Sequence, residues 1–167
     1  AAALKKSPAR KSAASKTAAK PTARKKIKAR AVPAPKPAAK RPKQRIAISH
    51  HREEDFKADG LRTYAQYRDL GIAAASHGLA QAHVIRLQRP CNPAEVSKLH
   101  FHNVDFQMVY VLRGWVEFEY ADIGRVRLAA GSSVYQPPGI PHRELAHSED
   151  IEMLEITAPA VFETTHV

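Results

Sequence analysis

Three histidines at the spacing of metal ligands dominate the chemistry that this sequence can offer. His100 and His102 are separated by one residue, so on a β-strand both imidazoles would project from the same face. His142 follows the turn sequence PPGIP, whose prolines restrict the backbone that presents it. Neutral imidazole binds divalent transition metals and leaves positions open for a further ligand. The spacing therefore predicts a metal site, with Fe, Zn, Mn and Ni as the alternatives.

A fourth candidate, Gln107, lies where another ligand is expected and carries no charge. Its amide offers only a neutral carbonyl oxygen or two N–H donors. We expect Gln107 either to bind the metal weakly or to hydrogen-bond a metal-bound water or substrate. Three neutral histidines would leave the full +2 charge on a divalent ion, which favours a small anionic substrate. No catalytic base stands out in the sequence.

Short strand-like runs position these residues, and Gly- and Pro-rich turns separate the runs. The runs are residues 82–87, 106–112, 115–120 and 151–157. Many short strands and no long helical period predict an all-β sandwich or barrel. His83, inside the first run, is expected to be a hydrogen-bonded or surface histidine and not a ligand.

The run FQMVYVL, residues 106–112, is apolar on both faces. Alternation places Gln107, Val109 and Val111 on one face. A strand that is apolar on both faces is normally covered on both. The outer face is therefore expected to lie under a second sheet, an N-terminal strand or a dimer partner, and we expect a homodimer.

The two histidine-containing stretches resemble the two signature motifs of the cupin superfamily, in particular its small single-domain members. In the first motif, G-x5-H-x-H-x(3,4)-E-x6-G, the matching residues are His100, His102 and Gly114. In the second, G-x5-P-x-G-x2-H-x3-N, they are Gly131, Pro137, Gly139 and His142. Ala94, Gln107 and Ala146 depart from the motifs, and Gln107 stands where the family has a glutamate ligand.

The resemblance implies an all-β double-stranded β-helix, or jelly-roll barrel, over residues 60–167, with residues 46–59 as a connecting segment. It implies that His100, His102 and His142 hold the metal inside one end of the barrel. Cupins with three histidine ligands include Fe(II) dioxygenases in which substrate and O2 take the open positions. The absence of a ligand carboxylate argues against reactions in which that carboxylate removes a proton.

Residues 1–45 have a different composition from the rest of the chain. They contain 16 Lys or Arg residues and no acidic residue, whereas the remaining residues carry a net charge of −5. Six prolines and few large apolar residues predict a disordered basic tail. It could be a solubilising segment, a non-specific nucleic-acid-binding segment, or a transit peptide or anionic-membrane contact.

The remaining features indicate a cytoplasmic protein in a reducing compartment. Cys91 is the single cysteine, so no internal disulfide can form. No apolar run reaches the roughly 18 residues that span a bilayer. The sequence thus predicts a small cupin with a three-histidine metal site, leaning towards an Fe(II)-dependent dioxygenase of a small anionic substrate. The alternative is a non-catalytic ligand-binding or regulatory cupin whose tail binds nucleic acid.

Overall fold

The computed structural model describes residues 42–60, 62–96 and 98–167. The predicted disordered tail, residues 1–45, lies outside these residues except for its last four. The strands are β1 (Ala65–Asp69), β2 (Gln81–Leu87), β3 (His100–His102), β4 (Phe106–Arg113), β5 (Trp115–Tyr120), β6 (Gly124–Ala129), β7 (Ser133–Tyr135), β8 (His142–His147), β9 (Glu152–Ala158) and β10 (Thr164–His166). The short helices are η1 (Glu53–Asp55), α1 (Ile72–Ser76) and α2 (Pro93–Val96).

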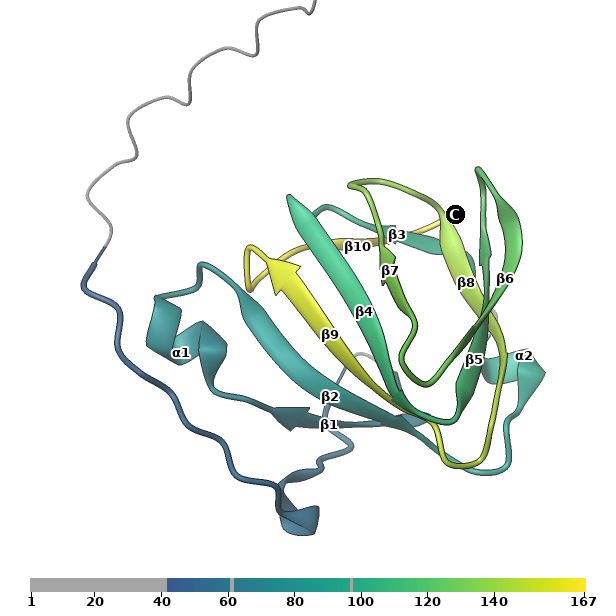
Figure 1. Ribbon diagram of the computed structural model, residues 1–167. Coiled ribbons are helices and arrows are strands. Elements are labelled where there is room, and N and C mark those ends of the chain that lie inside the picture. Colours follow the sequence, from purple (N-terminus) through teal and green to yellow (C-terminus); the bar gives the residue numbers. More distant parts are fainter. Residues whose placement is uncertain (1–41, 61, 97) are drawn as a thin grey trace, which may run out of the picture. The chain divides into compact units, whose positions relative to one another are not determined.

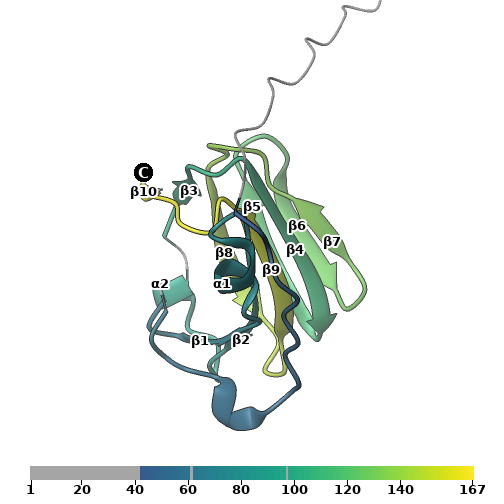
Figure 2. The ribbon, with the colours of Figure 1, turned by 90° about the vertical axis from the view of Figure 1, so that its left-hand side faces the viewer.

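Two antiparallel five-stranded sheets face one another, as Figures 1 and 2 show. We call the sheet with strand order β1-β2-β9-β4-β7 sheet A and the sheet with order β10-β3-β8-β5-β6 sheet B. Their inner faces share one hydrophobic core, to which β4 and β9 of sheet A and β5 of sheet B contribute buried residues. The predicted all-β class is therefore confirmed.

The inner face of sheet A changes from apolar to polar along its strands. Met153 of β9 lies between Ile85 of β2 and Val111 of β4, and all three are buried. Two residues further along β9, Glu155 lies opposite His83 of β2. The apolar end of the interior supplies packing free energy, while the polar end forms one wall of the site described below.

The outer face of β4 remains open. Phe106, Tyr110 and Leu112 are 39%, 38% and 46% exposed, and the Phe106 ring packs beside that of Tyr135 on β7 at a centroid distance of 5.6 Å. Val109 and Val111, which the alternation placed on one face with Gln107, are buried. No described part of the chain therefore gives the outer face the full cover that the apolar pattern predicts.

Part of the segment predicted as a connection, residues 46–59, packs on sheet A. Phe56 is buried, and Lys57 forms an isolated bridge with Tyr67 of β1. Glu53 pairs with Arg86 of β2 through two hydrogen bonds of 2.8 and 3.2 Å. These contacts fix the chain just before Gly60, where it forms one side of a cleft.

Within the described residues, none of the helices has the length and apolar character needed to cross a lipid bilayer.

Candidate metal site

The three predicted ligands lie close together on sheet B, His100 and His102 on β3 and His142 on β8. The ring centroids of His100 and His142 are 4.6 Å apart, those of His100 and His102 are 4.9 Å apart, and those of His102 and His142 are 5.3 Å apart. One ring nitrogen of each histidine lies within 4.8 Å of the others, and all three residues are buried. This group, the histidine cluster, is the one set of three or more His, Cys and acidic side chains in the described residues whose donor atoms are close enough to share an ion.

Each histidine of the cluster uses its Nδ1 atom for a contact with the protein. The partners are the Lys98 carbonyl at 2.8 Å from His100, the Thr164 hydroxyl at 2.8 Å from His102, and the Ile140 carbonyl at 2.9 Å from His142. A carbonyl can only accept, so Nδ1 of His100 and of His142 carries the proton. In the neutral ring this leaves the Nε2 lone pair for an ion, which is the arrangement typical of metal-bound histidine.

Burial keeps the cluster neutral. It lowers the pKa of His100 and of His102 to about 4, and it also lowers the pKa of His142. Imidazole must be neutral to bind a metal. At neutral pH the cluster therefore offers three neutral nitrogen donors, a set that fits a divalent transition metal.

The turn before β8 and the C-terminal strand hold the histidines in place. Gly139 adopts a φ of +71°, which favours glycine, and its N–H donates to the His102 carbonyl at 3.2 Å. His100 and His142 are the one register pair that joins β3 to β8. On the other side of β3, β10 pairs with all three of its residues and brings Thr164 to His102.

Gln107 faces the cluster from the opposite sheet. It is buried on β4, and it lines a small cavity of about 10 Å³ together with His142 and Glu155. Its Nε2 atom donates to Glu155 Oε1 at 2.9 Å. The structure thus places Gln107 in a cavity beside one predicted ligand, with its amide already engaged on one side.

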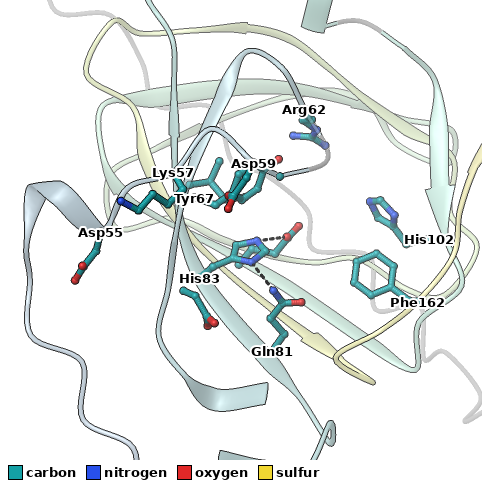
Figure 3. A pocket seen from close by; sticks show the side chains of 13 residues that line it. Asp55, Lys57, Asp59, Arg62, Tyr67, Gln81, His83, His102 and Phe162 are labelled. Atoms are coloured by element: carbon teal, nitrogen blue, oxygen red, sulfur yellow. Dashed lines mark hydrogen bonds and ion pairs between the residues drawn. The ribbon is translucent and has the colours of Figure 1, made fainter. Parts of the chain in front are cut away.

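A cleft of about 430 Å³ opens next to the cluster. His102 and Phe162 lie at one end of it, with their ring centroids 5.1 Å apart, and Asp55 and Lys57 lie at the other (Figure 3). A smaller hollow of about 300 Å³ includes His100 and His166 in its lining. Both volumes suit a small ligand, and the larger one brings it beside His102.

Arg62 lines both hollows. Its Nη2 atom lies 3.4 Å from Nε2 of His100, and its Nη1 atom lies 3.5 Å from Oε2 of Glu144. Burial raises the pKa of Glu144 to about 7, although Arg62 acts in the opposite direction. Neither oxygen of Glu144 has a hydrogen-bond partner in the described part of the chain. Glu144 thus neutralises the guanidinium only in part, Glu155 also acts on it, and Arg62 lies where it can contact an anion in either hollow.

Sequence reasoning did not single out Arg62, Glu144 or Glu155 as site residues. Glu144 follows His142 by two residues on one strand, and Glu155 follows buried Met153 in the same way. Residues two positions apart on a strand point to the same face, so an acidic residue at that distance from a ligand or a core residue is expected to face the interior. This pattern could have identified both Glu144 and Glu155. Arg62 lies in a loop, where no such period exists.

His83 is buried beside the cleft and makes hydrogen bonds with both ring nitrogens. Nε2 lies 2.8 Å from Glu155 Oε2, and Nδ1 lies 3.2 Å from the Gln81 amide nitrogen (Figure 3). It lies outside the histidine cluster.

Comparison with solved structures finds the same architecture in several proteins. KdgF from Halomonas sp. is 19% identical, with a TM-score of 0.53 over 68% of this chain and 96% of that one. The polyketide cyclase RemF from Streptomyces resistomycificus is 18% identical, with a TM-score of 0.57 over 72% and 85%. Oxalate decarboxylase from Bacillus subtilis is 17% identical, with a TM-score of 0.55 over 75% and 32%. At these identities the likeness concerns the fold.

The family comparison rests on sequence. No curated protein matches this chain. Residues 91–157 match the family model described as the Cupin domain, a range that contains all three histidines of the cluster and Gln107. The two-sheet architecture and the solved structures agree with that match. This chain therefore contains a cupin domain.

Proposed function

We propose that the chain binds one divalent transition metal ion through Nε2 of His100, His102 and His142. The observation that carries this proposal is the set of Nδ1 contacts. In His100 and His142 the carbonyl partner fixes the proton on Nδ1 and leaves the Nε2 lone pair to an ion, which at His100 would replace the 3.4 Å contact with Arg62 Nη2. The low pKa of His100 and of His102, about 4, supports it because both rings are neutral at neutral pH. A bound ion would act as a Lewis acid and, as Fe(II), would supply oxygen chemistry.

We further propose that the substrate is a small anion that enters through the 430 Å³ cleft. Arg62 supports this proposal because it lines the cleft, is largely buried, and has in Glu144 a counter-ion whose raised pKa of about 7 weakens the pairing near neutral pH. The guanidinium can bind a carboxylate or phenolate, and Phe162 offers an apolar surface beside His102. These side chains would bind and orient the substrate and limit the entry of water.

Oxidation by O2 is the reaction class that we favour. Three neutral donors leave coordination positions for two further ligands, and an anionic bidentate substrate would offset the charge of the ion. Suitable substrates are the enolate of a β-diketone, a phenolate-carboxylate and a thiolate-carboxylate.

Metal analysis of protein purified without a His-tag column tests the binding proposal. We expect one transition metal ion per chain, either retained or taken up on titration. His102→Ala should abolish binding and leave the barrel folded. The matched control is His147→Ala, because His147 is also buried but lies at the far end of β8 from His142. A wild-type protein that neither retains nor binds a transition metal would contradict the proposal.

Oxygen uptake tests the reaction class. The Fe(II)-loaded protein should consume O2 with at least one of the three substrate types, and His102→Ala should not. Metal binding without O2 uptake on any of them would overturn the dioxygenase assignment while leaving the metal site intact.

A second function, nucleic-acid association, rests on the 16 basic residues and no acidic residue in residues 1–45. Lys and Arg at this density release counterions from phosphate backbones, so binding should fall steeply as salt increases. Retention on duplex DNA at low salt should disappear when residues 1–45 are deleted. Equal retention of the full chain and the truncated chain would exclude this role for the tail.

A further inference from the structure

The carboxylate that is missing at position 107 is present on the neighbouring strand. Gln107 of β4 lies opposite Thr157 of β9, so Glu155 is its diagonal neighbour on the inner face of sheet A. Glu155 Oε1 accepts a hydrogen bond from Gln107 Nε2 at 2.9 Å. Both residues line the small cavity that also contains His142. An acidic group therefore lies beside the cluster and is hydrogen-bonded to the amide at position 107.

The contacts of Glu155 keep it ionised. Its side chain is only 14% exposed, and its second oxygen, Oε2, accepts from His83 Nε2 at 2.8 Å. Both carboxylate oxygens therefore face an N–H donor, Nε2 of Gln107 on one side and Nε2 of His83 on the other, and such hydrogen bonds favour the ionised form. Glu155 is therefore a fixed negative charge in the wall of the site.

This fixed charge determines how Gln107 is oriented. An ionised carboxylate only accepts hydrogen bonds, so the Gln107 amide must turn its Nε2 towards Glu155. Oε1 then becomes the atom that Gln107 can offer to a cation or to a metal-bound water. Without an acceptor beside Nε2, the amide could equally present its N–H group, which repels a cation.

The charge of Glu155 also acts on the histidine cluster. Glu155 lines the large cleft together with His102 and the small cavity together with His142. A buried negative charge at this position attracts a cation held between those rings. The contact geometry and the electrostatic effect thus agree.

We propose that Glu155 serves as the outer carboxylate of the metal site, orienting Gln107 and supplying the negative charge that a ligand glutamate would otherwise provide. The proposal rests on the proposed metal site and deepens it. Glu155 is a positioning residue, because it acts through Gln107 and through its charge. His83 holds Glu155 in place from the other side.

Titration of the metal-free protein with Zn²⁺ or Mn²⁺ alone, followed by calorimetry, tests this role. Glu155→Gln should weaken binding by about 10- to 100-fold, as loss of an outer hydrogen-bond partner does in other metal sites. The variant can keep its hydrogen bonds, since the new amide can accept from His83 and donate to a Gln107 whose amide has turned over. It should therefore fold, and the turned Gln107 would present N–H to the ion.

Exchanging the two side chains gives the decisive comparison. The double variant Gln107→Glu, Glu155→Gln keeps the total charge and the hydrogen bond between the strands but moves the carboxylate to position 107. It should bind at least as tightly as the wild type. Glu152→Gln is the matched control, because Glu152 is on the same strand and pairs with Arg86 at 2.7 Å, outside the cluster. Its affinity should be unchanged.

The outcomes separate this inference from the proposed function. If the wild type binds no metal, the proposed site itself fails. Wild-type binding that Glu155→Gln leaves unchanged, or a double variant as weak as Glu155→Gln, would overturn the role of Glu155 alone. A loss in Glu152→Gln equal to that in Glu155→Gln would also overturn it, because the effect would then not depend on the contact with Gln107.

Discussion

Thr164 of the C-terminal strand lies 2.8 Å from Nδ1 of His102 through its hydroxyl oxygen. This contact makes β10 part of the site, although its residues follow the family match, which ends at residue 157. The orientation of one ring of the cluster therefore depends on the last few residues of the chain.

Replacing Thr164 by valine should weaken metal binding. Valine has nearly the same shape but no hydroxyl, so His102 would lose the partner of Nδ1. We expect about a tenfold loss of affinity for Zn²⁺ in a calorimetric titration. Thr164→Ser is the matched control, because it keeps the hydroxyl and should stay near the wild-type value. Equal affinities for the two variants would show that the hydroxyl does not orient the ring.

The free energy of unfolding of the metal-free protein should decrease as the pH falls. The pKa of His100 and of His102 is about 4 in the folded state and 6.5 ordinarily, so the unfolded chain binds more protons between these values. Stability is then complete above about pH 6.5 and is lost towards pH 4, with a slope of roughly 1–2 kcal/mol per pH unit. Urea unfolding at a series of pH values measures the slope, and a flat profile would contradict the burial argument.

Glu144 should oppose this decrease of the free energy of unfolding at low pH. Its pKa is raised from 4.5 to about 7, so the folded state binds more protons than the unfolded chain between those values, and its contribution to stability decreases as the pH rises. Glu144→Gln removes that contribution. The loss of stability on acidification should therefore be steeper in Glu144→Gln than in the wild type in the same urea experiment. A shallower slope would show that Glu144 is ionised in the folded protein at neutral pH.

Gly114, between β4 and β5, should not tolerate a side chain. Its φ is +68°, and an added Cβ would collide with the Ser148 hydroxyl and lie 2.7 Å from Asp150 Oδ1. Gly114→Ala should cost about 2 kcal/mol or more, combining left-handed strain with the collision. Gly124→Ala isolates the strain, because Gly124 has a φ of +74° and no atom within 4 Å of the added Cβ. Equal losses in urea unfolding would rule out the collision.

We propose that the exposed outer face of β4 is covered by a second copy of the chain. Tyr110 and Leu112 are exposed there, and the Phe106–Tyr135 pair extends the apolar surface onto β7. Tyr110→Arg should convert a dimer to a monomer, as measured by light scattering after gel filtration. Ile123→Arg, at an exposed site in the turn between β5 and β6, should leave the dimer intact. A monomeric wild type would contradict this proposal.

Side chains on a β-strand alternate between two faces, and this two-residue period explains why much of the site could be predicted from the sequence. It placed His100 and His102 on one face of a strand and grouped Gln107, Val109 and Val111 on one face of another, and all five are buried. The period depends only on local backbone geometry, so it needs no knowledge of which strands are neighbours. The turn before His142 could be predicted for the same reason, because it depends only on the sequence of the turn itself.

Sheet order and loop geometry explain what the sequence could not give. Glu155 matters because β9 lies between β2 and β4, which brings it to His83 and diagonally next to Gln107. No pattern within residues 151–157 specifies that order. Arg62 reaches His100 from a loop 38 positions earlier in the chain, and its place depends on the packing of the preceding segment against β1.

The single register pair between β3 and β8 has a kinetic consequence. Strand pairing joins β3 to β8 only at His100 and His142, which are themselves members of the cluster, and the N–H of Gly139 adds one hydrogen bond to the His102 carbonyl. An edge with so few backbone hydrogen bonds to the neighbouring strand is a candidate for local opening. An ion shared by the three histidines would tie β3 to β8, so metal binding should slow the opening of that edge.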